Sequence, residues 1–252
     1  MSAQSFAAAL AQARAEATIV GHAAWEGSIQ SVSDAYAVQD ELARGLVVRG
    51  WKVTALKPEQ QRGYRSDRPV AGALLAPYVH SAPATLPLAS FITPLLECEV
   101  AFILGADLPA RATPYSREEI EAAIEAVVSV MEVADGRVAP GAPDLFKLAD
   151  DMGNGAFIVG EPVREWRKLD LGRIGVTLTL DGKETWQGES ARILGNPLLA
   201  VIALANAQPL PAGGLKRGQI VTTGTCTTPI APRAGAYVAK FDALGSVSVR
   251  FA

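Results

Sequence analysis

The sequence contains few of the residues that most often carry catalysis and bind transition metals. Among 252 residues there are only two histidines, His22 and His80, and two cysteines, Cys98 and Cys226. Histidine is the usual general base near neutral pH and the commonest ligand of transition metals. The two cysteines lie far apart in the sequence, which disfavours a thiolate zinc site, and they are too few for a disulfide framework. If the chain is an enzyme, its chemistry therefore rests on carboxylates, on lysine or on a hard cation bound by oxygen.

The sequence also lacks an excess of basic residues and any long apolar run. With 23 basic and 26 acidic side chains, the formal charge is −3, which gives no electrostatic footprint for nucleic acid. No apolar run approaches the ~20 residues that span a membrane. The N-terminus carries Glu16 and shows no basic start followed by a long apolar run, so it does not read as a secretory signal. We therefore expect a cytoplasmic protein that binds neither nucleic acid nor membrane.

The hydrophobic residues, 49% of the chain, are enough for a sizeable core, and their pattern indicates an α+β fold. Alanine-rich residues 3–17 and apolar residues at helical spacing after Ser33-Asp34 predict two N-terminal helices. After residue 155, short β-rich segments alternate with turns, with one helix expected over 197–206. We predict a single domain over 1–252, in which 1–50 is mainly helical and 51–252 is a β-rich core.

Three local signals refine this prediction. The dipeptide Asp181-Gly182 predicts a hairpin turn, and the five prolines within 58–87 exclude a long helix there. Ser116 and Glu119 form a capping box. The apolar residues that follow, from Ile120 to Met131, recur at helical spacing, so a helix is expected through this whole segment.

Glu97 and Glu99 are the first candidates for chemistry. They lie two residues apart on a strand predicted over 95–104, LLECEVAFIL, so both side chains point to the same face. Two like charges on a buried face are unfavourable unless a cation or protons lie between them, and Mg²⁺ or Mn²⁺ suits carboxylate ligands. The alternative is a solvent-exposed polar edge, which is the more frequent situation for an E-x-E pattern taken alone.

Further charged residues allow similar alternatives. Glu132 and Asp135, in VMEVADGR, lie either at the end of the predicted helix or on a strand after it. Lys52 interrupts the apolar strand 51–56, WKVTAL, where a lysine commonly extends its ammonium group to the surface. Asp150-Asp151 precedes two glycines and is either a ligand pair or part of a turn.

Taken in order, several segments resemble the hydratase/decarboxylase branch of the fumarylacetoacetate hydrolase family. The matching segments cover about residues 30 to 252 and are AYAVQ, GWKV, LLECEVAFIL, VMEVADGR, AFIVG, LGNPLLAVIALAN, GQIVTTGTCT and LGSVSVRF. The resemblance implies a mixed β-sheet roll with an N-terminal helical region. It also implies a homo-oligomer that acts on small 2-oxo or 2-hydroxy-dienoic acids.

The resemblance further assigns roles to individual residues. It implies that Glu97, Glu99 and Glu132 bind Mg²⁺ or Mn²⁺, with Asp135 as the fallback for the third ligand, and that Lys52 lies close to the substrate. Three weaker assignments as substrate contacts are Leu56, Asp150 and Thr227. This match favours a metal site over a solvent-exposed position for the E-x-E pair.

The sequence departs from the family pattern at two places. Related hydratases carry an acid in the segment that corresponds to DRPVAG, where this chain has Val70 and Ala71 and the nearest acid is Asp67. The D-N-A-S segment of the family appears here as residues 150–153, DDMG. Both changes bear on how water is activated and leave the three carboxylates intact.

The resemblance therefore leads to one main hypothesis and three alternatives. The main hypothesis is a metal-dependent hydratase of 2-hydroxypenta-2,4-dienoate-type acids that yields 4-hydroxy-2-oxo acids in aromatic-compound catabolism. The first alternative is a 4-oxalocrotonate-type decarboxylase that uses the same metal site, which Val70 makes more credible. Hydrolysis of an acylpyruvate is a further option, although no His–Glu dyad supports it. The last alternative is a non-catalytic metal-binding partner of a pathway enzyme.

Overall fold

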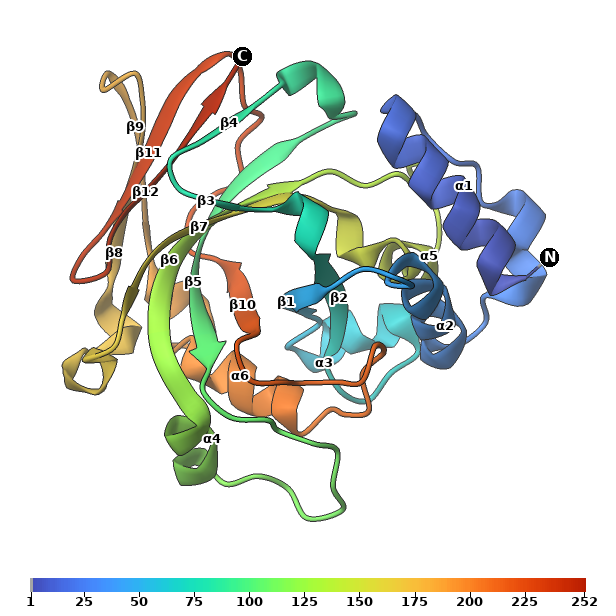
Figure 1. The fold of residues 1–252 in the computed structure, drawn as a ribbon, viewed down its shortest axis with the longest axis horizontal. Helices are drawn as coiled ribbons and strands as arrows, with labels where there is room; N and C mark the ends of the chain where they lie inside the picture. The colour runs from blue at the N-terminus through green and yellow to red at the C-terminus, as the bar shows by residue number, and fades with distance from the viewer. Residues whose placement is uncertain (1) are drawn as a thin grey trace.

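The computed structural model describes residues 2–252, which form two β-sheets with helices around them (Figure 1). The helices are α1 (Ala3–Glu16), α2 (Val32–Leu42), α3 (Pro58–Gln61), α4 (Arg117–Ala123), α5 (Asp144–Ala149) and α6 (Leu198–Ala205). The first six strands are β1 (Val48–Thr54), β2 (Val70–Leu75), β3 (Val79–Ser81), β4 (Ala84–Leu86), β5 (Leu95–Leu104) and β6 (Ile124–Ala134). The remaining strands are β7 (Asn154–Val163), β8 (Gly175–Leu180), β9 (Glu184–Glu189), β10 (Ile220–Thr225), β11 (Gly235–Phe241) and β12 (Gly245–Phe251).

The larger sheet is mixed and strongly curled. Its seven strands run in the order β2-β1-β10-β5-β6-β7-β3, with β1 parallel to β10 and β5 antiparallel to both β10 and β6. The smaller sheet has the order β4-β12-β11-β8-β9. The chain thus has the α+β architecture and the curled mixed sheet that the sequence predicted.

The N-terminal helices cover the end of the large sheet where β1 and β2 lie. Helix α1 packs on α2 and α2 packs on α5, on the right-hand side of Figure 1. Phe6, Phe146 and Val70 are buried together in this cluster, with Phe6 and Phe146 in edge-to-face contact at 5.5 Å. The helical region that the sequence predicted before residue 51 therefore encloses one side of the sheet.

The long helix predicted after Ser116 is wrong beyond Ala123. The capping box forms, with the Ser116 hydroxyl accepting from the Glu119 amide, but α4 ends at Ala123 and the chain continues as strand β6 from Ile124. The residues of β6 are rich in valine, whose branched side chains favour strands. Every β6 residue from Ala126 to Val133 is buried. On one face Val127, Met131 and Val133 pack into the main core, and on the other Val128 and Val130 pack into a second cluster. An apolar run buried on both faces satisfies a helical spacing and a strand spacing equally well.

The other local predictions agree more closely with the structure. The hairpin turn at Asp181-Gly182 is confirmed, with φ of +50° and +67° between β8 and β9. Helix α2 starts two residues earlier than Ser33-Asp34 indicated, because Ser31 is the N-cap and its side chain accepts from the Asp34 amide. The proline-rich segment contains only short elements, including the fully buried strand β2. Within residues 2–252, no helix is long and apolar enough to cross a membrane.

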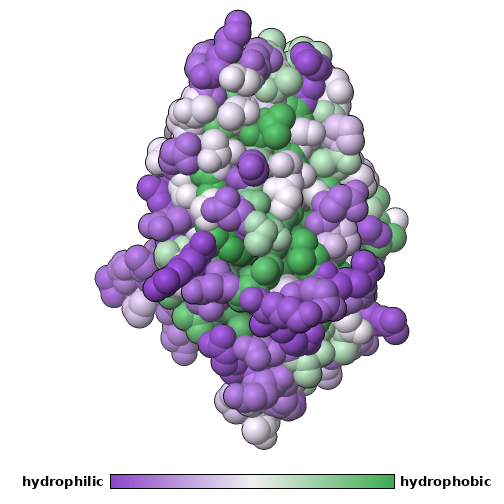
Figure 2. All heavy atoms as spheres, turned by 90° about the vertical axis from the view of Figure 1, so that its left-hand side faces the viewer, coloured by the Kyte–Doolittle hydropathy of each residue, from purple (hydrophilic) through white to green (hydrophobic). Residues whose placement is uncertain are grey.

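The small sheet forms one face of the molecule. Figure 2 shows this face, where apolar side chains gather in the centre between polar ones. Val238, on β11, is 40% exposed. Its neighbour on β12 is Ser248, opposite it in the register.

Candidate metal centre

Three glutamates come together where β5 pairs with β6. The antiparallel register places Glu97 directly opposite Glu132, and Glu99 follows two residues along the same strand. Because alternate residues of a strand share a face, all three side chains point to one side of the sheet. One carboxylate oxygen from each lies within 4.8 Å of the others, which is the spacing that a single ion bridges. The strand spacing predicted the shared face of Glu97 and Glu99, and the family resemblance named Glu132 as the third ligand. The structure brings all three together.

The interior position of this cluster overturns the solvent-exposed alternative. Glu99 and Glu132 are 1% and 0% exposed, and Glu97 is half-buried. Burial raises the pKa of Glu99 well above its usual range, and the nearby carboxylates of Glu132 and Glu97 raise it further. Burial and the Glu132 carboxylate likewise raise the pKa of Glu97. Three carboxylates held this way bind protons or a cation in preference to remaining charged side by side.

Strand β10 supplies hydrogen bonds that orient Glu99. The Gly224 amide donates to Glu99 Oε2 at 2.9 Å, and the Thr222 hydroxyl donates to the same oxygen. Gly224 has φ +112°, a conformation that favours glycine. The sequence indicated neither residue as part of the site, although both lie in the GQIVTTGTCT segment that carried part of the family resemblance.

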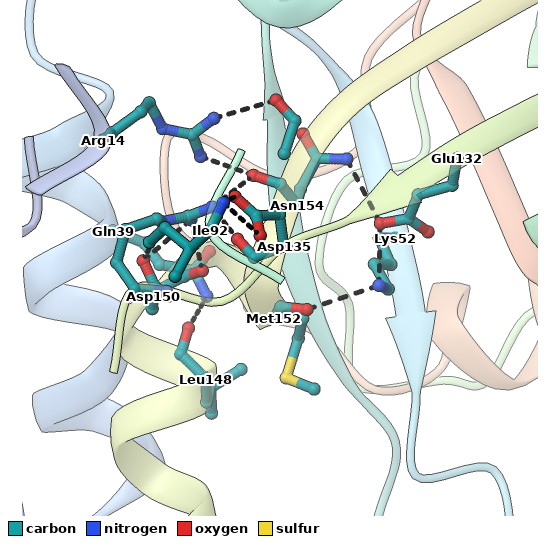
Figure 3. A network of polar contacts seen from close by, with 12 residues as sticks. Arg14, Gln39, Lys52, Ile92, Glu132, Asp135, Leu148, Asp150, Met152 and Asn154 are labelled. Atoms are coloured by element: carbon teal, nitrogen blue, oxygen red, sulfur yellow. Dashed lines mark hydrogen bonds and ion pairs between the residues drawn. The ribbon is translucent and has the colours of Figure 1, made fainter. Parts of the chain in front are cut away.

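Lys52 reaches the same cluster from β1. Its Nζ donates to Glu132 Oε1 at 2.7 Å and to the Met152 carbonyl at 3.3 Å (Figure 3). Burial alone lowers the pKa of Lys52, but the carboxylates of Glu132 and its two neighbours outweigh burial and raise this pKa above its ordinary value. The side chain is 13% exposed, so the interpretation of Lys52 as a surface lysine is wrong.

The polar atoms of this centre fit a divalent cation. Glu132 Oε1 accepts from Lys52 and, at 3.2 Å, from Nδ2 of the Asn154 side chain, whereas Glu132 Oε2 is buried without a hydrogen-bond partner among residues 2–252. A buried carboxylate oxygen without a donor is costly unless a cation contacts it. Three carboxylates and one ammonium leave two negative charges, which one Mg²⁺ or Mn²⁺ balances with the oxygen ligands it prefers.

A buried arginine fixes the segment that contacts Lys52. Arg137 donates to the Asp150 carboxylate through its backbone amide at 2.7 Å and its Nε at 2.8 Å, and its guanidinium also reaches the carbonyl oxygens of Asp135, Asp150 and Asn154. Two successive residues of this segment, Asp151 and Met152, have φ of +48° and +56°. Such left-handed backbone persists only where the surroundings hold it. The hydrogen bonds of Arg137 thereby hold the segment so that the Met152 carbonyl faces Lys52.

A glycine on β2 makes room for this turn. A Cβ at Gly72 would meet the Asp151 carbonyl oxygen at 2.3 Å, so only glycine fits here. Gly72 pairs with Lys52 across β1 and β2. The turn of residues 151–152 therefore lies directly against the strand pair that carries the lysine.

Two residues that the sequence put forward for the site lie in other surroundings. Both carboxylate oxygens of Asp135 accept from the Ile92 amide, and Oδ1 also accepts from the Thr93 amide at 2.7 Å. Asp135 therefore fixes the loop before β5 and is not part of the three-carboxylate cluster. Asp150 is buried, and its carboxylate is taken up by Arg137, which leaves it a structural role behind the site.

The remaining predicted residues are placed as follows. Leu56 is half-buried and packs against the main core, and Thr227 is fully buried next to Cys226. Val70 is buried under the N-terminal helices, while the Asp67 side chain is 98% exposed. The strand β2 thus brings no carboxylate to the position where the family resemblance led us to expect an acid.

Proteins similar in sequence to this chain include hydratases and decarboxylases. A 2-keto-4-pentenoate hydratase of Burkholderia vietnamiensis is 33% identical over 224 residues, 86% of this chain and 85% of the hydratase. A 4-oxalocrotonate decarboxylase of a Pseudomonas species is 33% identical over 167 residues, 64% of this chain and 62% of the decarboxylase. No protein-family model matches the sequence.

A solved structure gives the same fold. The 4-oxalocrotonate decarboxylase of Pseudomonas putida G7, complexed with magnesium and adipate, superposes with a TM-score of 0.84 and 24% identity, covering 99% of this chain and 97% of that one. Fold, carboxylate cluster and relatives together define a lyase with a site suited to a divalent cation. More specifically, the chain belongs to the hydratase/decarboxylase branch of the fumarylacetoacetate hydrolase family.

Proposed function

We propose that this chain is a Mg²⁺- or Mn²⁺-dependent hydratase of 2-hydroxypenta-2,4-dienoate-type acids, giving 4-hydroxy-2-oxo acids in the catabolism of aromatic compounds. The observation that carries the proposal is the buried cluster of Glu97, Glu99 and Glu132 in direct contact with Lys52. The hydratase names of several relatives, including the one 33% identical to this chain, support the reaction.

A cation bound at this site would act as the electrophilic catalyst. When bound, a divalent cation supplies a Lewis acid that polarises the 2-oxo group of the substrate and favours negative charge on its oxygen. Glu97, Glu99 and Glu132 would hold the cation from one side of the sheet. Glu97, the half-buried member, lies nearest to solvent and marks the side from which the substrate enters.

Lys52 is placed to handle the proton at the substrate oxygen. An ammonium group has three donors, and Glu132 and Met152 use two of them. The third donor is available to hydrogen-bond the 2-oxygen of the substrate and to transfer a proton when the dienol becomes the 2-oxo form. The raised pKa keeps Lys52 charged between turnovers, as a hydrogen-bond donor must be.

Decarboxylation of a 4-oxalocrotonate-type acid is the second candidate, and one observation favours it. A hydratase must activate water, whereas Val70 is buried, Asp67 faces solvent, and β2 supplies no carboxylate toward Lys52. The same cation site would accept the electrons released as CO₂ leaves. The intact contact between Lys52 and Glu132 argues against a third possibility, a non-catalytic metal-binding partner of a pathway enzyme.

The two reactions are separated by incubating the protein with each acid. With Mg²⁺ present, a hydratase converts 2-hydroxypenta-2,4-dienoate to a 4-hydroxy-2-oxo acid, and the ultraviolet absorbance of the dienol decays. Release of CO₂ from 4-oxalocrotonate with no hydration of the dienoate would contradict the hydratase and establish the second candidate. No reaction with either acid, with Mg²⁺ or Mn²⁺, would contradict both.

We also propose that the chain forms a homo-oligomer and is located in the cytoplasm. The apolar centre of the small-sheet face, with Val238 exposed, supports a homo-oligomer formed through apolar contact (Figure 2). Light scattering coupled to gel filtration tests this, since a mass of a single 26.4 kDa chain would contradict it. Cell fractionation tests the location.

A further inference from the structure

A cavity of about 390 Å³ lies beyond the metal centre, at the end of strands β5 and β6. We call it the distal pocket, and its apolar lining includes Ile19, Ile92, Leu95, Val138, Pro140 and Met152. We propose that the distal pocket binds an apolar distal end of the substrate, so that the chain prefers 2-oxo or 2-hydroxy-dienoic monoacids with an alkyl end over diacids. This inference rests on the proposed function, because it places the acid and 2-oxo groups of the substrate at the metal centre.

The sheet register connects the distal pocket to the metal centre. Leu95 pairs with Ala134, two residues along from the pair of Glu97 and Glu132, and both Leu95 and Ala134 line the pocket. Residues two apart on a strand share a face and lie about 7 Å apart. Met152 links the two regions as well, because its carbonyl accepts from Lys52 while the residue lines the pocket. The pocket therefore begins one side chain beyond the glutamates.

The length of the substrate matches this spacing. An extended chain advances about 3.5 Å for every three bonds. With carbons 1 and 2 at the metal centre, carbon 5 lies about 3.5 Å further on and carbon 6 about 5 Å further on, by the same geometry. An acid of six or more carbons that is directed along the strands therefore brings its distal end against Leu95.

The lining favours an uncharged group. Ile19 and Leu95 are each 42% exposed, and they are two of the six large apolar side chains within residues 2–252 that are more than a third exposed. Exposed apolar side chains gathered around one cavity indicate a site for an apolar ligand. Each methylene buried there improves binding about fourfold or more.

The charged residues around the pocket offer little to a second carboxylate. Asp135 accepts from the Ile92 and Thr93 amides, and Asp150 is bound by Arg137. Lys147, the one cation that lines the pocket in the described chain, is paired with Asp144 at 2.8 Å. A distal carboxylate would therefore lose its water without gaining a free cation, next to two acids.

Binding of two unreactive acids tests the proposal without turnover. Isothermal titration with Mg²⁺ present compares 2-oxohexanoate, which ends in a methyl group, with 2-oxoadipate, which ends in a carboxylate. We expect 2-oxohexanoate to bind at least tenfold more tightly. In Leu95→Lys the preference should shrink by at least tenfold or reverse, because a cation now faces the distal end. Val47→Lys, at an apolar side chain 63% exposed and outside the pocket, serves as the matched control and should leave the preference unchanged.

Each other outcome contradicts a specific part of the account. Mg²⁺-dependent binding of both acids with 2-oxoadipate equal or tighter would overturn the inference and leave the metal centre in place. The inference would equally fail if Lys147→Ala selectively weakened 2-oxoadipate, since Lys147 would then be the partner of a distal carboxylate. Absence of Mg²⁺-dependent binding of either acid would overturn the proposed function and this inference with it. If Leu95→Lys does not fold, as judged by its circular dichroism, Ile19→Lys replaces it with the same expected result.

Discussion

Lys52 and Glu132 meet at 2.7 Å, from two strands that lie three positions apart in the large sheet. The contact occupies one carboxylate oxygen of Glu132 and leaves the other buried without a donor in residues 2–252. A single glutamate thus contacts Lys52 with one oxygen and leaves the other available to a cation.

Removing one carboxylate charge should abolish metal binding and turnover. In Glu99→Gln the amide keeps the size of the side chain but binds a cation poorly, so Mg²⁺-dependent turnover should fall by more than about 100-fold. The Mn²⁺ affinity, measured by isothermal titration, should fall with it. Glu165→Gln, at a surface side chain, is the matched control. Wild-type metal affinity in Glu99→Gln would remove Glu99 from the site.

Loss of the lysine should separate turnover from metal binding. Lys52→Met keeps the length of the side chain and removes its donors, so kcat should fall by about 10²- to 10⁴-fold if Lys52 transfers a proton. Mn²⁺ binding should remain, because the three carboxylates are unchanged. Lys168→Met, at an exposed lysine, controls for general effects. Unchanged kcat in Lys52→Met would contradict the role of Lys52.

The stabilisation that Mg²⁺ gives should increase with pH. Burial raises the pKa of Glu97 and Glu99, so the folded metal-free protein binds protons more tightly than the unfolded chain and loses stability as the pH rises. A cation binds the deprotonated carboxylates and removes this loss. The gain in Tm on adding Mg²⁺ should therefore be larger at pH 8 than at pH 6. A gain that is equal at both values would contradict the coupling.

Asp151 should make the protein less stable at high pH. Burial raises the pKa of Asp151 to about 7, so the stability linked to its protonated form is present below about pH 4 and is lost as the pH rises through 7. Asp151→Asn carries no charge, and its advantage in Tm over the wild type should grow from pH 5 to pH 8. Asp67→Asn, at a side chain 98% exposed, is the control and should show no such trend. A constant difference between Asp151→Asn and the wild type would contradict the prediction.

The sequence predicted the parts of the site that depend on local spacing. Glu97 and Glu99 share a face because strands alternate, and this holds wherever the strand lies in the sheet. Their partner, Glu132, lies on β6, a segment that was predicted to be a helix because its apolar residues recur at helical spacing. Only the pairing of β5 with β6 brings Glu132 opposite Glu97. The family resemblance supplied what spacing along one strand could not.

The sequence gives no indication of the long-range contacts around the site. Arg137, Asp150 and Met152 act together through backbone carbonyls, and a sequence does not show which carbonyl an arginine will reach. Asp150 was predicted to contact the substrate because the sequence does not show that its carboxylate pairs with Arg137. The distal pocket likewise depends on Ile19 and Leu95, which lie far apart in the sequence and meet only in the fold.

A metal titration of the same sample, followed by both binding and turnover, tests the central claim most directly. Protein stripped of metal with a chelator should not hydrate 2-hydroxypenta-2,4-dienoate. Addition of Mn²⁺ should restore the reaction in proportion to occupancy of one site per chain, and Glu132→Gln should abolish both signals. Full hydration by the stripped protein, or saturating Mn²⁺ binding with no gain in turnover of this acid, would contradict the account.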